Sequence, residues 1–273
     1  YKIYEPFIRM AAGFGEASIK HDKERYEHKY EYCDLLITGS GPSGLASAYA
    51  AAKNGARVIL AEDKPRFGGS LLTSDVNIGN QTGVEWTEKI IAELKSMPNV
   101  TVKNRSQVFG YYDHNMLVMS ERISDHLPKT QKYLPKQRLW YIRANEVLIS
   151  SGSIERPLVF GNNDTPGVML SSAAKEYMKV YGVLVGKKPL IFTNNDSGYE
   201  TAIEFKKNGV NPIILDTRCN PSSDIITEAK NLNIEIKFSY VVVAAKGYKK
   251  VKSADIAKIS DDKKELFNIE NIK

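Results

Sequence analysis

Short apolar runs alternate with glycine-containing turns and helix-like segments along the middle of the chain. The run 34–38 is apolar, ends in the glycine-rich turn 39–44 and leads into an alanine-rich, helix-like segment, 45–53. A second strand-like run, 57–61, ends in two acidic residues. Continuous apolar runs of this length are typical of strands buried on both faces of a parallel sheet. The pattern therefore predicts a βαβ unit with a right-handed crossover.

The segments after this unit continue as a domain with an inserted hairpin. Apolar positions at helical spacing between 84 and 97 predict an amphipathic helix. Apolar runs predict strands over 100–102, 107–111, 116–120, 139–143 and 146–150. We therefore expect an N-terminal approach segment, 1–31, followed by a first dinucleotide-binding domain, 32–160.

A strand, a polar turn, a helix and a strand are predicted again over 189–215, in the order of the first unit. Two such units predict an α/β protein with the Rossmann-like FAD/NAD(P)-binding fold of the two-dinucleotide-domain oxidoreductases. We assign 161–252 to this second unit, with a further strand at 240–245. The charged segment 253–273 is expected to be a truncated tail without a closing apolar strand.

Composition and charge narrow the classes of function. The net charge is +6, from 38 Lys and Arg against 32 Asp and Glu. The lysines are scattered and arginine is scarce, so no nucleic-acid interface is expected. No apolar run approaches the roughly 20 residues that span a bilayer, so no membrane segment is expected either.

The two cysteines and the first residue add further expectations. Cys33 and Cys219 lie far apart in the sequence, which excludes a disulfide framework and a four-cysteine zinc site and fits a reducing cytoplasm. The histidines have no spacing that indicates a metal, so no metal site is predicted. Because the chain begins at Tyr1 and not at Met, we expect it to be a piece of a longer protein.

The turn after the first strand carries the strongest chemical signal. Gly39 permits the tight turn off the strand, Gly41 lets the backbone approach a pyrophosphate, and Gly44 allows the helix to pack close to the strand. Pro42 and Ser43 complete the turn, and the following helix presents its N-terminus to the phosphates. The strand before and the helix after this motif predict a dinucleotide site.

Acidic and small residues extend the predicted site. Glu62 lies 18 residues after Gly44, where a carboxylate accepts hydrogen bonds from the adenosine ribose and repels a 2′-phosphate. Asp63 either shares that role or is a solvated turn residue. Gly69 with its neighbour Gly68, followed by Ser70, either approaches the same dinucleotide or forms only a tight turn.

The second unit lacks the glycine pattern. Its turn reads Asn-Asn-Asp-Ser-Gly over 194–198, and the side chains of Asn194 and Asp196 occupy the space of a pyrophosphate. This unit is therefore expected to keep the fold without ordinary NAD(P)H binding. No nucleophile, acid or base constellation is found, so the catalytic residues are unknown; His114 is interpreted as a turn residue.

Several segments resemble the alpha subunit of heterotetrameric sarcosine oxidases. The resemblance covers roughly 4–218 and includes the turn of the second unit, where most two-dinucleotide proteins have glycines. The segments that carry the resemblance are 33–45, 58–63, 67–72, 109–115, 155–160, 163–164, 166–170 and 192–196.

The resemblance implies a cofactor and partners. It implies NAD in the first glycine motif, with contacts at Ser43, Glu62, Asp63, Ser70 and Val108. It implies FAD in a beta subunit, FMN at the alpha–beta interface, and further gamma and delta subunits. The implied reaction is oxidative demethylation of sarcosine to glycine with hydrogen peroxide and 5,10-methylenetetrahydrofolate, but the folate-binding region of the family has no counterpart in this sequence.

Two alternatives stay open. The chain could be the FAD-binding subunit of an opine or cyanide-forming dehydrogenase, because NAD and FAD present the same ADP half to such a groove. It could also be a non-catalytic, nucleotide-binding scaffold that docks a catalytic partner, which agrees with the lack of a catalytic constellation.

Overall fold

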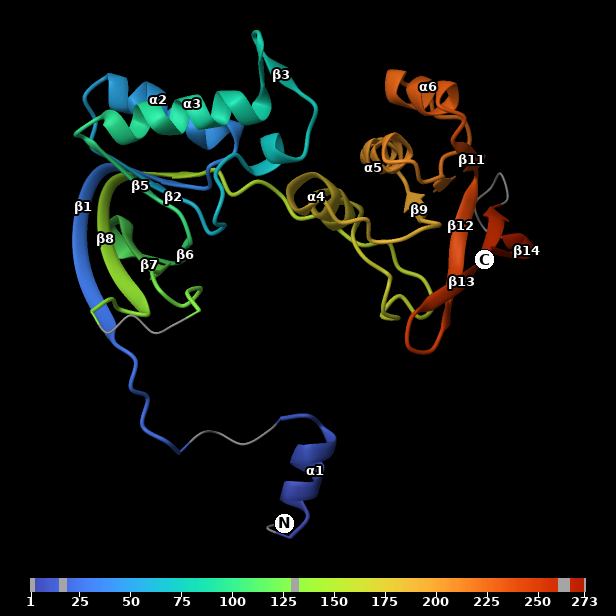
Figure 1. Ribbon diagram of the computed structural model, residues 1–273, viewed down its shortest axis with the longest axis horizontal. Coiled ribbons are helices and arrows are strands. Elements are labelled where there is room, and N and C mark those ends of the chain that lie inside the picture. Colours follow the sequence, from blue (N-terminus) through green and yellow to red (C-terminus); the bar gives the residue numbers. More distant parts are fainter. Residues whose placement is uncertain (1–2, 15–18, 129–132, 260–265, 273) are drawn as a thin grey trace.

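The computed structural model describes residues 3–14, 19–128, 133–259 and 266–272. It contains two α/β units, preceded by the short helix α1 (Glu5–Ala11), which buries none of its residues (Figure 1). The first unit leads into the second through an irregular segment, 150–170.

A six-stranded sheet forms the centre of the first unit, with the strand order β5-β2-β1-β8-β7-β6. The first four strands run parallel, and β7 and β6 continue the sheet antiparallel. The strands are β1 (Tyr26–Thr38), β2 (Val58–Ala61), β5 (Val100–Lys103), β6 (Ser106–Tyr112), β7 (Met116–Arg122) and β8 (Gln137–Ile149). A small hairpin is formed by β3 (Asn77–Ile78) and β4 (Gln81–Thr82).

Alternate residues of the central strands face two different apolar clusters. Ile37 and Leu60 pack against α2 (Pro42–Lys53) and α3 (Gly83–Ser96), which cover one face of the sheet (Figure 1). Leu36 and Ile59, their chain neighbours, pack on the other face with residues of β7 and β8. This burial on both faces explains why β1 and β2 read as continuous apolar runs around Leu36 and Leu60.

The second unit is a smaller sandwich. A parallel sheet with the order β11-β10-β9 packs against three helices, and an antiparallel sheet, β12-β13-β14, follows it in the chain. The helices are α4 (Ser171–Tyr181), α5 (Ser197–Lys207) and α6 (Asp224–Asn231). The strands are β9 (Leu190–Thr193), β10 (Ile213–Asp216), β11 (Glu235–Phe238), β12 (Tyr240–Gly247), β13 (Val251–Ile259) and β14 (Leu266–Ile272).

The predicted fold class is confirmed, and several element boundaries are corrected. β1 starts at Tyr26, inside the predicted approach segment, because its N-terminal half pairs with β8. The two strands predicted at 139–143 and 146–150 are one strand, since its pairing with β1 keeps the same register before and after Asn145.

The expectation of a tail without strands is wrong. Ser253–Ile259 belongs to β13, and β14 follows it. Alternation of small, apolar and charged residues hides β13 in the sequence, but Ala254 and Ile256 are buried against Leu215 of β10. Helices α4 and α6 and strand β11 were also not predicted.

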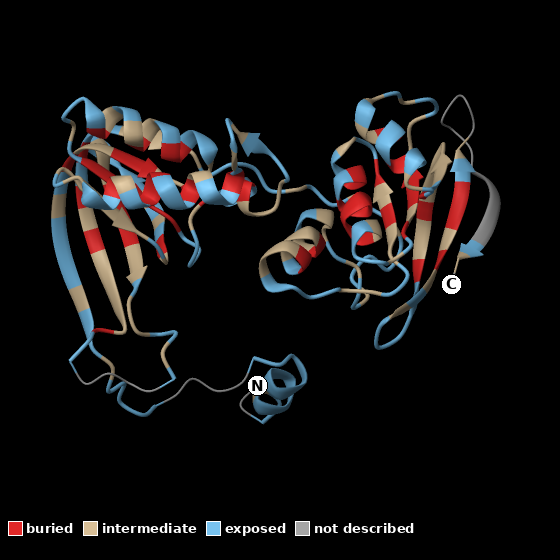
Figure 2. Ribbon diagram, turned by 45° about the horizontal axis from the view of Figure 1, so that its top comes forward, coloured by how far each residue is buried: buried red, intermediate tan, exposed pale blue. Residues whose placement is uncertain are grey.

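Burial follows the sheets and the helix faces that cover them, and α1 is exposed (Figure 2). Among the helices within the described ranges, we find none with the length and apolar character needed to cross a bilayer.

Candidate functional site

The glycine turn between β1 and α2 is closely packed on one side and open on the other. Gly39 has a φ of +99°, and a Cβ there would lie 2.4 Å from the carbonyl oxygen of Ser150. A Cβ on Gly44 would lie 2.0 Å from the carbonyl oxygen of Gly39. A Cβ on Gly41, in contrast, would meet nothing within 4 Å. The packing requires glycine at 39 and 44, and the surface over Gly41 is free for a ligand.

The first turn of α2 supplies donors for an anion. Gly41 is the N-cap residue and makes no side-chain cap bond, and Pro42 occupies the first helical position, where no N–H is needed. The N–H groups of Ser43 and Gly44 have no intrahelical acceptor at this end of a helix. Pro42 and Ser43 are exposed. Such a turn binds phosphate groups through its N–H groups and its helix dipole.

Glu62, immediately after β2, is buried and already engaged by the protein. Its carboxylate accepts hydrogen bonds from the Ser40 N–H at 2.9 Å, the Ser40 hydroxyl at 2.5 Å and the Lys64 N–H at 2.9 Å. Burial, and after it the neighbouring Asp63, raises the pKa of Glu62, and the bonds from Ser40 and Lys64 act in the opposite direction. Asp63 itself is exposed at the edge of the site.

The glycine pair lies against the glycine turn. The Gly68 N–H donates to the carbonyl oxygen of Ser40 at 3.0 Å, and a Cβ on Gly69 would lie 3.0 Å from Cα of Gly41. Ser70 is exposed in the 3-10 turn η1 (Gly69–Leu72) that follows. The pair is therefore more than a tight turn, because it forms one wall of the surface over Gly41.

Val108 lies further along β6, which starts next to the site. The N–H of Ser106 donates to the carbonyl oxygen of Glu62 at 2.7 Å, two residues before Val108. The Val108 side chain is half-buried and packs on the sheet cluster that includes Ile59. The structure thus gathers the glycines, Glu62, Asp63 and Ser70, and places Val108 at the margin.

Two features of the site were missed in the sequence. One is Ser40, whose hydroxyl binds Glu62, and the other is the segment after β8, whose Ser150 backbone lies against Gly39. The sequence did show that Ser40, between Gly39 and Gly41, is polar, and this could have suggested a hydrogen bond within the turn. No sequence signal placed Ser150 beside a turn more than a hundred residues away.

In the second unit, charged side chains join the turn after β9 to the end of β10. Arg218 donates a hydrogen bond to Asp216 at the end of β10 and forms an ion pair with Asp196 in the turn, each at 2.8 Å. Asp216 is fully buried and also accepts a hydrogen bond of 2.7 Å from the Tyr199 hydroxyl. The turn is also one residue shorter than that of the first unit. Gly198, which packs on Thr193, comes five residues after the end of β9, whereas Gly44 comes six residues after the end of β1.

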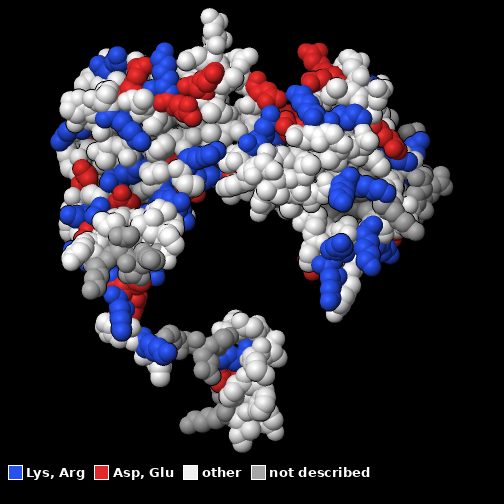
Figure 3. All heavy atoms as spheres, in the orientation of Figure 1, with Lys and Arg blue, Asp and Glu red and all other residues white. Residues whose placement is uncertain are grey.

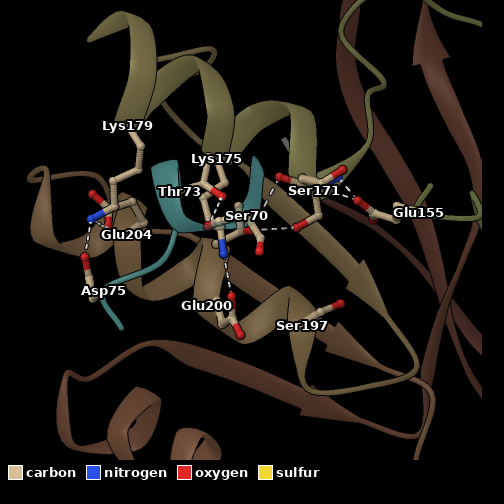
Figure 4. Close-up of polar contacts among 12 residues, drawn as sticks. Ser70, Thr73, Asp75, Glu155, Ser171, Lys175, Lys179, Ser197, Glu200 and Glu204 are labelled. Carbon is tan, nitrogen blue, oxygen red and sulfur yellow. Dashed lines mark hydrogen bonds and ion pairs between the residues drawn. The ribbon is translucent and has the colours of Figure 1, made fainter. Parts of the chain in front are cut away.

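The two units contact each other through α4. Lys64, two residues after Glu62, donates to Glu176 of α4 at 2.8 Å. Lys179 of α4 lies between two carboxylates, 2.6 Å from Asp75 of the first unit and 2.9 Å from Glu204 of α5 (Figure 4). Lys207 adds a bond of 3.2 Å to Asp75. The site-bearing loops 62–75 are thereby tied to the second unit by charge.

Acidification is expected to loosen this contact. The hydrogen bond from Lys179 is the largest cause that lowers the pKa of Asp75. The ion pair therefore stabilises the folded chain fully above the ordinary pKa of an aspartate, about 3.9. This stabilisation is lost as the pH falls through the lowered pKa that Asp75 has in the folded chain. We expect the radius of gyration from small-angle scattering to rise between pH 6 and pH 3, and Asp75→Asn to show the larger value already at pH 6.

Asp22→Asn is the matched control for that experiment. The pKa of Asp22 is also lowered, but by Glu24 and Tyr26 within its own N-terminal segment. An Asp75→Asn chain with the unsubstituted radius of gyration at pH 6 would refute the role of this contact.

The remaining candidates show no reactive arrangement. Burial raises the pKa of the Cys33 thiol to about 12, and Cys219 is exposed and free. His114 lies in a left-handed turn (φ 57°), as interpreted from the sequence. Among the residues placed by the structure, no cluster of three or more His, Cys, Asp or Glu side chains is arranged to hold a metal. Lys and Arg are spread over both units on the face shown in Figure 3, interleaved with acids.

Comparison with known proteins shows which families the chain is similar to. Residues 34–122 match the family described as FAD dependent oxidoreductase. The sarcosine oxidase alpha chain of Rhizobium meliloti is 41% identical over 93% of this chain and 25% of the relative. That of Corynebacterium sp. (strain P-1) is 34% identical over 86% of this chain and 24% of the relative. An opine oxidase chain of Agrobacterium tumefaciens is 26% identical over 59% of the chain and 33% of the relative.

Solved structures confirm the fold. Thioredoxin reductase of T. acidophilum matches with a TM-score of 0.63 at 17% identity, over 88% of this chain and 74% of that one. L-proline dehydrogenase of P. horikoshii matches with a TM-score of 0.58 at 19% identity, over 93% of this chain and 43% of that one. The chain spans only about a quarter of the length of the sarcosine oxidase alpha chains it matches.

Proposed function

Because the chain belongs to the family of sarcosine oxidase alpha chains, we propose that it is the dinucleotide-binding part of an oxidoreductase subunit of that type. The observation that carries the proposal is the open surface over Gly41, bordered by the N-terminus of α2, the glycine pair and the carboxylates of Glu62 and Asp63. These groups suit an ADP moiety, with the pyrophosphate at the helix and the ribose at the acids.

The nucleotide we propose is NAD. The relatives that are 34–41% identical are sarcosine oxidase alpha chains, a resemblance that implies NAD. The acids at 62 and 63 disfavour a 2′-phosphate, which argues against NADP. FAD is the second candidate, favoured by the match of 34–122 to FAD dependent oxidoreductases, since FAD carries the same ADP half. When bound, either nucleotide supplies hydride-transfer chemistry.

The described residues of the site bind and orient the nucleotide, and we find no reactive group among them. The first turn of α2 neutralises phosphate charge, Glu62 and Asp63 accept from ribose hydroxyls, and Gly41 and Gly69 allow close approach. In the proposed assembly, oxidation of sarcosine takes place at FAD in a beta subunit, with FMN at the alpha–beta interface and gamma and delta subunits completing a cytoplasmic heterotetramer. A scaffold role, with the nucleotide bound for stability, remains the candidate from another class.

Identification of the released nucleotide tests the proposal. We expect that denaturing the purified chain releases NAD, identified by mass and by absorbance near 260 nm without a flavin band. FAD in its place would support the opine oxidase-like alternative. A chain that releases no nucleotide and binds neither NAD nor FAD when they are added would overturn the proposal. Co-purification of a yellow, flavin-bearing partner would separate the subunit from the scaffold.

A further inference from the structure

We propose that the Ser40 hydroxyl is the positioning group of the first site, holding the Glu62 carboxylate and the Gly68 loop in the geometry that recognises an adenosine ribose without a 2′-phosphate. This inference rests on the proposed function and names the residue that sets its selectivity. It is carried by the burial and the hydrogen bonds of Ser40.

Ser40 has no exposed surface, and its hydroxyl bridges two loops. It donates to a carboxylate oxygen of Glu62 at 2.5 Å, and it shares the Gly68 N–H, at 3.2 Å, with the carbonyl oxygen of Ser40, at 3.0 Å. A hydroxyl has one proton to donate, so the bond to Glu62 uses it fully. The phosphate-binding turn, the acid after β2 and the wall formed by Gly68 and Gly69 are thus joined at one atom.

The bonds made by Ser40 restrict how Glu62 meets a ligand. A carboxylate has about four acceptor positions, and three protein donors, two of them from Ser40, already occupy Glu62. One position is left for a ribose hydroxyl. A carboxylate fixed in this way accepts one bond in one direction and repels a phosphate placed there.

The charged groups around Glu62 explain why the hydroxyl matters. Asp63 lies beside it and raises its pKa, and Lys64 is drawn away by Glu176 of α4. Arg122 of β7 donates to the carbonyl oxygen of Asp63 at 2.6 Å, and Lys103 of β5 lies over the ring of Trp140. The Ser40 hydroxyl is therefore a principal donor that favours the ionised form of Glu62.

Ser40→Ala is the test, with ADP-ribose as the probe because it is the part shared by NAD and FAD. The Ser40–Glu62 bond is made in the free chain as well, so its loss acts on binding only through the position and protonation of Glu62, which corresponds to up to roughly tenfold weaker binding. We expect that loss for ADP-ribose, a smaller loss for 2′-phospho-ADP-ribose, and hence reduced discrimination between the two probes. Removal of the donor raises the pKa of Glu62 further, so Glu62 is protonated earlier as the pH is lowered. During acidification, the Ser40→Ala chain is therefore expected to lose ADP-ribose at a higher pH than the unsubstituted chain.

Ser106→Ala is the matched control. Ser106 is equally buried, but its hydroxyl donates to the carbonyl oxygen of Asn104 at 2.8 Å and not to a carboxylate. Both variants lose one buried hydroxyl, so a similar fall in thermal stability is expected. The discrimination between probes and the pH midpoint of binding should change in Ser40→Ala alone.

A double-mutant cycle with Glu62→Gln completes the test. If Ser40 acts through Glu62, the effect of Ser40→Ala is smaller in the Glu62→Gln background. Equal effects in both backgrounds, or an unchanged pH midpoint and discrimination in Ser40→Ala, would overturn the inference and leave the proposed function standing. Failure of the unsubstituted chain to bind ADP-ribose overturns both.

Discussion

Replacing Gly41 with alanine is expected to weaken nucleotide binding by roughly ten- to a hundredfold while the fold is retained, because inserting a methyl group into a close contact opposes it by about 1–3 kcal/mol. In the free chain the added methyl group meets no atom within 4 Å, and the backbone at Gly41 (φ −66°, ψ −178°) is one that alanine adopts without strain. The methyl group would stand where a pyrophosphate approaches. Titration with ADP-ribose, next to thermal unfolding of the same sample, measures both effects.

Two other glycines are the controls for this variant. Gly186→Ala also meets nothing within 4 Å but lies in the second unit, so neither binding nor stability should change. Gly44→Ala forces a methyl group to 2.0 Å from a carbonyl oxygen, so the fold itself is expected to be damaged. Unchanged ADP-ribose affinity in Gly41→Ala would show that the nucleotide does not lie over this turn.

The sequence predicted the first βαβ unit because its determinants are local. The apolar run of β1, the spacing of Gly39, Gly41 and Gly44, and the alanine-rich helix lie within about 20 consecutive residues. Such signals need no knowledge of the rest of the chain. The position of Glu62 after β2 could be predicted for the same reason.

The elements that were not predicted depend on pairing between distant parts of the chain. The N-terminal half of β1 has no apolar run and is a strand because β8 pairs with it, more than a hundred residues later. β13 likewise depends on β12 and on burial against Leu215. The orientation of the Glu62 carboxylate could not be predicted either, because it is set by a contact with Ser40, 22 residues away.

Replacing Arg218 with methionine is expected to destabilise the second unit by about 3 kcal/mol. Asp216 is fully buried, and Arg218 is the cation that compensates it through its side chain. Without the guanidinium, the donors left to the carboxylate among the described residues are the Tyr199 hydroxyl and the backbone N–H of residue 218. Because Arg218 is 31% exposed, water enters beside it and the loss lies at the lower end of the range for a broken buried pair. Thermal unfolding should shift by roughly 6–12 °C.

The double variant Asp216→Asn with Arg218→Met separates charge from packing. It removes the uncompensated carboxylate, so it is expected to recover part of the stability that Arg218→Met alone loses. Arg57→Met is the matched control, because its partner Asp34 is on the surface and that pair is open to solvent, so its loss should be much smaller. If Arg218→Met and Arg57→Met unfold at the same temperature, Asp216 is not held by Arg218. The stability of the second unit would then not depend on this ion pair.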